Sequence, residues 1–118
     1  MNPVSAATMS DFSPLGVLEE QILVAVIRTA DGAYGMQVRR EIERVTEREL
    51  AIGAVYATLD RLEEKGLVSS RRVISEGASR RVFAVSAGGA RALSDTRVMR
   101  ERLWSGVDLQ RLTVLARA

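Results

Sequence analysis

The hydrophobic and polar positions in the first half of the chain predict three helices. Apolar residues recur at helical spacing over residues 15–29, about 35–45 and 52–65. Gly66 follows the third segment directly, which is typical of the residue after a helix C-terminus. The first segment is apolar almost all round, and such a helix must be covered on more than one side. In so small a domain this pattern indicates a second subunit.

The third segment has one apolar face and one face of small or charged residues. At about 100° per residue, Val55, Leu59 and Leu62 share the apolar side. The opposite side carries Gly53, Ala57, Asp60, Arg61 and Glu64, with Tyr56 on the flank. Small residues at the start of this face would let it enter a groove. The plainer interpretation is an ordinary amphipathic surface helix.

The next stretch predicts a two-stranded β-hairpin. β-Branched and apolar residues occupy positions 67–68, 73–74 and 82–85, and Glu76-Gly77 supplies a short polar turn before the last run. Because an isolated hairpin is unstable in water, we expect it to pack on the helices.

A final helix is predicted from Ala87 towards the end of the chain. Ser86 supplies its N-cap, and Gly106 is expected to bend or weaken it. Its early turns are too polar to be fully buried, and its apolar residues gather from Val98 onward.

The composition fits one domain that lacks the side chains of most enzyme mechanisms. The chain has 118 residues, 47% of them apolar, with no Cys and no His. Their absence excludes structural disulfides, thiolate or imidazole metal sites and His-based acid/base catalysis. The adjacent carboxylates Glu19-Glu20 and Glu63-Glu64 do not share a helix face. We therefore expect no enzyme, no metal and no cofactor.

Residues 1–14 are small, polar and aperiodic and contain both Pro residues, which predicts a disordered lead-in without a targeting signal. The longest apolar run, residues 22–27, is far shorter than the ~20 residues that span a bilayer. The sequence thus predicts a cytoplasmic protein with no membrane partner.

Charge is distributed unevenly along the chain. Residues 1–66 carry seven Lys or Arg and eleven Asp or Glu, whereas residues 67–118 carry ten Arg and four acids. The pairs Arg71-Arg72 and Arg80-Arg81 flank the expected hairpin turn. A cationic patch of this kind suits a polyanion such as DNA. The alternative is a solvated Arg-rich surface.

Three helices, a hairpin with Arg at its base and a long helix follow one another in the order of a winged helix-turn-helix. Three blocks carry a closer likeness: Tyr34-Gly35, residues 53–68 (GAVYATLDRLEEKGLV) and residues 80–89 (RRVFAVSAGG). In this order and at these distances they resemble the PadR family of bacterial transcription regulators, over about residues 15–104.

The resemblance implies a mainly α fold with a small β-hairpin (α+β). Residues 15–86 would form a winged helix-turn-helix DNA-binding domain and residues 87–118 an added C-terminal dimerisation helix. It also implies a homodimeric repressor on a two-fold-related double-stranded DNA operator, released by a small-molecule effector. The implied DNA contacts are Tyr34, Gly35, Gly53, Ala54, Tyr56, Ala57, Arg61, Lys65, Arg71, Arg72, Arg80 and Arg81.

Two positions depart from the family's pattern or leave a question. Ala51 stands where a Ser often caps the recognition helix, and loss of such a cap typically costs about 1 kcal/mol. Asp60 would face phosphate with the wrong sign unless it pairs with Arg61 or accepts from a cytosine amino group.

Trp104 lies among apolar residues of the expected dimerisation helix and has two interpretations. It would simply fill a dimer core, or it would line an apolar cavity between subunits and stack on a planar hydrophobic effector, as the resemblance to short family members implies. The effector-binding candidates are Met99, Leu103, Trp104 and Val107.

A winged helix that serves only protein–protein contact, without DNA binding, is the alternative function. The four Arg of the hairpin favour DNA, because an apolar docking surface does not need them.

Overall fold

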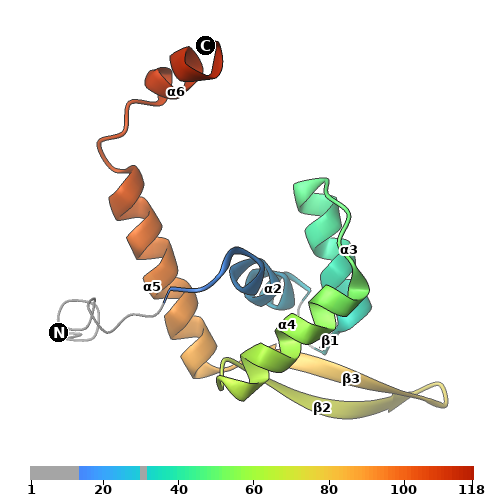
Figure 1. Ribbon diagram of the computed structural model, residues 1–118. Helices are drawn as coiled ribbons and strands as arrows, with labels where there is room; N and C mark the ends of the chain where they lie inside the picture. Colours follow the sequence, from blue (N-terminus) through green and yellow to red (C-terminus); the bar gives the residue numbers. More distant parts are fainter. Residues whose placement is uncertain (1–13, 30–31) are drawn as a thin grey trace.

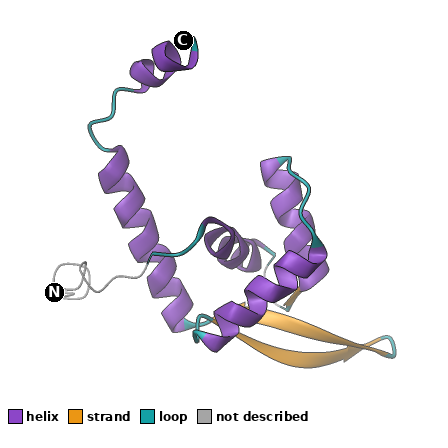
Figure 2. Ribbon diagram, viewed as in Figure 1, coloured by secondary structure: helices purple, strands orange, loops and turns teal. Residues whose placement is uncertain are grey.

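The computed structural model describes residues 14–29 and 32–118, so the lead-in expected at residues 1–14 lies outside them except for Pro14. The helices are α2 (Val17–Arg28), α3 (Gly35–Thr46), α4 (Ile52–Glu64), α5 (Ala87–Trp104) and α6 (Leu109–Ala116). The strands are β1 (Ala33–Tyr34), β2 (Val68–Ser75) and β3 (Ala78–Val85). Figure 1 shows their arrangement, and Figure 2 shows that helices dominate it. The predicted α+β winged-helix architecture is confirmed.

Helix α2 lies at the centre of the fold, where it packs against α3, α4, α5 and β3 (Figure 1). Its Ile22 and Leu23 are fully buried, as its apolar sequence requires. The core around them is supplied by α3, α4 and β3, through Val38, Ile42, Val55, Leu59, Leu62 and Phe83. The predicted apolar face of the third helix is therefore its buried face.

The hairpin has the turn that the sequence predicts. Ser75 and Ala78 are paired, and the two residues between them, Glu76 and Gly77, have φ of 52° and 77°. Two positive φ values in a two-residue loop are those of a type I′ turn, whose twist matches that of the strands. The outer half of the hairpin projects beyond the helices (Figure 1).

The sheet has three strands, not the two that the sequence predicts. Strand β1 pairs antiparallel with β3, with Ala33 opposite Phe83 and Tyr34 opposite Val82, which gives the order β1-β3-β2. A two-residue strand has no periodicity of its own. It is a strand because it lies beside β3 and pairs with it.

Helix α5 begins close against the loop between α4 and β2. The Ser86 hydroxyl accepts a hydrogen bond from the Gly89 amide at 3.0 Å and donates one to the Gly66 carbonyl at 2.6 Å. A Cβ on Gly89 would collide with the Leu67 carbonyl oxygen, so only glycine fits there. The predicted Ser86 N-cap is thus confirmed.

The prediction of a single C-terminal helix over residues 87–118 is wrong, because the structure has two helices there, α5 and α6. Gly106 has φ of 82°, which ends α5, and the Asp108 carboxylate caps α6 by accepting from the Gln110 amide at 3.0 Å. Helix α6 extends away from the body of the molecule (Figure 1). The radius of gyration is 17.0 Å, whereas a compact chain of this length has about 13–14 Å.

Across the described ranges, every helix is too short or too polar to cross a membrane.

Candidate nucleic-acid interface

The start of α3 meets the first turns of α4 through a glycine and an aromatic ring. A Cβ on Gly35 would lie within 3.0 Å of the Tyr56 ring, so the ring rests directly on the α3 backbone. Tyr56 keeps 36% of its surface exposed. The first amides of a helix have no partner within the helix and attract anions. The structure therefore brings three predicted contacts, Tyr34, Gly35 and Tyr56, to one helix start.

The wing, which is the hairpin of β2 and β3, reaches the same place. The Arg80 guanidinium lies 4.4 Å from the centre of the Tyr34 ring, a cation–π geometry. Arg80 itself is exposed. A cation held in this way next to a helix N-terminus is placed to meet a phosphate.

The exposed face of α4 is small at its beginning. Gly53 and Ala57 are exposed, and a Cβ on Gly53 would meet no atom within 4 Å. Ala51 is the N-cap residue and makes no side-chain cap, as the sequence predicts. Arg61 is exposed as well, and its Nη2 donates to the Thr58 hydroxyl at 3.2 Å.

The four Arg of the wing divide between its two faces. Side chains alternate along a strand, so the members of each pair point to opposite sides. Arg72 is opposite Arg81 on one face, whereas Arg80 is opposite Val73 and Arg71 opposite Val82 on the other. The four cations therefore do not form one patch.

Arg81 is bound to two carboxylates of α4. Its Nη1 donates to Asp60 at 2.7 Å and its Nη2 to Glu63 at 2.5 Å. Its Nε donates to the Ser70 hydroxyl at 3.2 Å, and that hydroxyl donates to Glu63 at 2.7 Å. The Ser70 hydroxyl and Arg81 lower the pKa of Glu63, and Asp60, followed by Glu63, raises the pKa of Arg81. The partner of Asp60 is thus Arg81, and not Arg61.

Lys65 lies at the other end of α4. Its Nζ donates to a Glu19 carboxylate oxygen at 2.7 Å, which joins the end of α4 to the start of α2. The bond lowers the pKa of Glu19, with a further contribution from the Gly16 amide. The structure therefore places Lys65 apart from the Tyr34–Tyr56 group and gives its charge a protein partner.

The sequence comparison decides the family, because the model of the transcriptional regulator PadR-like family matches residues 22–95. The chain belongs to the PadR-like family. No curated protein matches it significantly by sequence.

Solved structures share the fold of this PadR-like chain. RosR of H. salinarum is 25% identical, with a TM-score of 0.61, and the alignment covers 86% of this chain and 88% of RosR. The PadR-like regulator BC4206 of Bacillus cereus is 21% identical, with a TM-score of 0.64 and coverage of 85% and 92%. Bacillus subtilis PadR, solved in complex with operator DNA, is 19% identical, with a TM-score of 0.59 and coverage of 70% and 47%.

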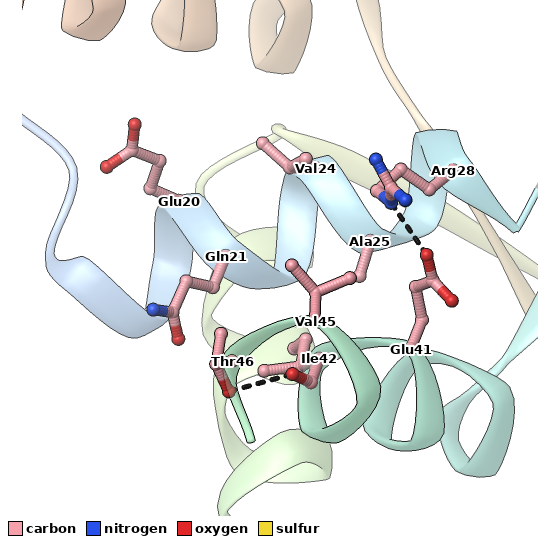
Figure 3. Close-up of a pocket in the computed structure, with 9 residues that line it drawn as sticks. All are labelled: Glu20, Gln21, Val24, Ala25, Arg28, Glu41, Ile42, Val45 and Thr46. Atoms are coloured by element: carbon pink, nitrogen blue, oxygen red, sulfur yellow. Dashed lines mark hydrogen bonds and ion pairs between the residues drawn. The ribbon is translucent and has the colours of Figure 1, made fainter. Parts of the chain in front are cut away.

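A second surface feature of the PadR-like chain escaped sequence reasoning. An apolar groove of about 190 Å³ runs between α2 and α3, with Val24 and Val45 on its walls (Figure 3). An ion pair between Arg28 and Glu41, 2.6 Å long, closes one end, and Arg44 and Arg28 lower the pKa of Glu41 to about 2. Every residue that lines the groove lies in α2 or α3, whereas the predicted effector residues lie in α5 and the loop after it.

Proposed function

We propose that this chain is a DNA-binding transcriptional regulator that acts as a homodimer on a two-fold-related operator. The observation that carries the proposal is the convergence of the α3 N-terminus, Tyr56 and Arg80 beside the small exposed face of α4. Backbone amides and Arg bind phosphates, while a helix face of small residues enters the major groove. Membership of a family of transcriptional regulators and the operator complex of the structurally similar Bacillus subtilis PadR support the same function.

The proposed DNA contacts are those expected from the sequence, with different weights. Tyr34, Gly35 and Arg80 would hold the DNA backbone, and Gly53, Ala54, Tyr56, Ala57 and Arg61 would face the groove. Arg71 and Arg72 are exposed and would add phosphate contacts from the wing. Lys65 and Arg81 have their charges paired within the protein, so we assign neither of them a direct bond to DNA.

The C-terminal helices supply the argument for a homodimer. Leu103 is 70% exposed, Leu109 65%, Val114 55% and Leu115 52%. Large contiguous apolar surfaces on a soluble protein mark an interface. A second copy of α5 and α6 would cover these side chains and set two recognition helices at a fixed separation. Half-sites would then lie about one or two helical turns apart.

Repression with release by a planar hydrophobic effector completes the proposal. Trp104 is 53% exposed and lies beside Leu103 and Val107, so a flat apolar molecule could stack on it between two subunits. The chain has one Trp, and quenching of its fluorescence would therefore report binding at this position. Unchanged Trp fluorescence and unchanged DNA affinity across a panel of planar apolar compounds would remove the effector part of the proposal.

The test of DNA binding is fluorescence anisotropy with a labelled duplex from the region upstream of the protein's own gene. A scrambled duplex is the matched control, and both are titrated at several salt concentrations. A dimer that neutralises about 6 to 10 phosphates should lose affinity steeply as salt rises. Tight, salt-sensitive binding that prefers the native duplex is the expected result.

Equal binding to the two duplexes would place the operator elsewhere and would contradict regulation of this gene by its own product. No binding to either duplex, even at low salt, would contradict DNA binding and favour a module for protein–protein contact.

A further inference from the structure

The two Arg at the base of the wing have different environments although they are adjacent in sequence. Arg80 is exposed and contacts the Tyr34 ring, with no carboxylate of the described residues bonded to it. Arg81 is half-buried, with 29% of its side chain exposed, and lies 4.7 Å from the centre of the ring of Phe83, which is itself buried. The alternation of the strand produces this difference.

The hydrogen bonds of Arg81 join three elements of the structure. All three of its guanidinium nitrogens are used, by Asp60 and Glu63 of α4 and by Ser70 of β2. Glu63 also accepts from the Ser70 amide at 3.1 Å. A planar fork of donors suits such bidentate and branched bonding, which an ammonium group cannot reproduce.

We propose that Arg81 is a positioning residue that fixes the wing against the recognition helix α4, and that it is not a ligand of DNA. Two DNA-reading elements must keep a set distance to engage one groove and its flanking backbone together. Arg81 sets this distance by bridging Asp60 and Glu63 to the wing. Its single positive charge also offsets one of the two negative charges of Asp60 and Glu63, which would otherwise repel phosphate from α4 more strongly. The inference rests on the proposed DNA binding, since α4 and the wing are its reading elements.

The substitution Arg81→Lys removes the bridge but keeps the positive charge. An ammonium group cannot bond Asp60, Glu63 and Ser70 in the way that the guanidinium fork does. We expect Arg81→Lys to weaken binding to the native duplex about tenfold, which corresponds to about 1.4 kcal/mol. The matched control is Arg44→Lys, which changes a guanidinium bonded twice to Glu41 on α3, outside the proposed DNA contacts, and should stay within about twofold of the wild type. Wild-type affinity in Arg81→Lys would overturn the proposal.

The salt dependence gives a second readout, which the loss of a phosphate ligand changes and the loss of a positioning residue does not. The double substitution Arg81→Gln with Glu63→Gln leaves the net charge unchanged and removes the bridge. We expect it to lower affinity while the slope of log K against log salt stays at the wild-type value. Arg80→Gln should flatten the slope by about 0.9 for each phosphate that the protein no longer neutralises. A flattening of this size in the double variant would show that Arg81 binds phosphate and would overturn the proposal.

A measurement on the free protein keeps the inference separate from the proposed function. Hydrogen exchange at the Ser70 amide, which donates to Glu63, reports the packing of the wing on the helix. We expect at least about tenfold faster exchange there in Arg81→Gln and no change in Arg80→Gln. Unchanged exchange in both would overturn the proposal. If the wild type binds neither duplex, the proposed function fails, while faster exchange in Arg81→Gln alone would still establish that Arg81 holds the wing.

Discussion

The body of the molecule and its C-terminal helices use apolar residues in opposite ways. From α2 to β3, apolar side chains form a closed core in which Leu59, Leu62 and Phe83 are at most 2% exposed. From α5 onward the buried residues of the helices are Gly89 and Thr96, and α6 buries none. The body is therefore stabilised by packing within one chain. The C-terminal region, in contrast, leaves large apolar side chains such as Leu103 and Leu109 uncovered by the other described residues.

Substitution inside the body should have the largest effect on stability. Leu59→Ala removes a fully buried side chain, and we expect it to lower the free energy of unfolding by about 2–5 kcal/mol. Because the cavity lies within one chain, the loss of stability should be the same at every protein concentration. Denaturant titrations at two concentrations a hundredfold apart measure this. A loss that depends on concentration would break the contrast between the two regions.

Substitution in α6 should act on assembly instead. Leu112→Arg places a charge in the proposed dimer interface in both copies, and we expect at least a hundredfold weaker dimer, or about 2.7 kcal/mol. Sedimentation equilibrium measures the change. Ile74→Arg at the wing, where the side chain is 78% exposed, is the matched control and should leave the dimer intact. A Leu112→Arg protein that remains as dimeric as the wild type would contradict the role of α6.

A substitution at the start of α4 should raise stability and lower DNA affinity. Gly53→Ala adds a Cβ that meets nothing within 4 Å, and Ala in a helix is favoured over Gly by roughly 0.5–1 kcal/mol. The same Cβ should obstruct close approach to the groove, and we expect about tenfold weaker binding, or about 1.4 kcal/mol. Thermal unfolding and anisotropy of one preparation measure both. Stabilised protein with unchanged affinity would mean that this face does not enter the groove.

The smallest expected effect is the acid sensitivity of the bond between α2 and α4. Lys65 and the Gly16 amide hold the pKa of Glu19 below its ordinary value of 4.5. Glu19 therefore stabilises the folded state above that value, and this contribution, about 1 kcal/mol, is lost as the pH falls through the lowered pKa. Glu19→Gln should be less stable than the wild type near neutral pH and should lose less stability on acidification. Lys65→Met should show the same change, and denaturant titrations at several pH values measure it. A pH dependence of stability equal to that of the wild type in both variants would contradict a stabilising bond between Lys65 and Glu19.

Sequence patterns predicted the elements that residues close together in the chain determine. Helical periodicity predicted α4 with its buried Val55, Leu59 and Leu62, and Glu76-Gly77 predicted the turn. Strand β1 was missed because two residues carry no period and its pairing depends on a strand about fifty residues further along. The break between α5 and α6 was underestimated, since the chain could bend at Gly106 or end its helix there.

The sequence predicted individual residues of the candidate site, but not which of them contact one another. Tyr34, Gly35 and Tyr56 come together because two short motifs pack on each other, which no single segment reveals. The bond between Asp60 and Arg81 spans 21 residues and depends on the tertiary packing of the hairpin on α4. One signal was present: Arg81 shares a strand face with Phe83, so alternation alone directs it towards the core.

The number of protein copies on a short duplex from the region upstream of the gene shows whether the C-terminal helices pair two DNA-binding bodies. Sedimentation velocity of the mixture gives the mass of the complex. We expect two copies per duplex for the wild type, and a loss of this complex in Leu112→Arg at concentrations where its body remains folded. A stable complex with one copy per duplex would contradict pairing through the C-terminal helices. No complex at low salt would contradict DNA binding by the body of the molecule.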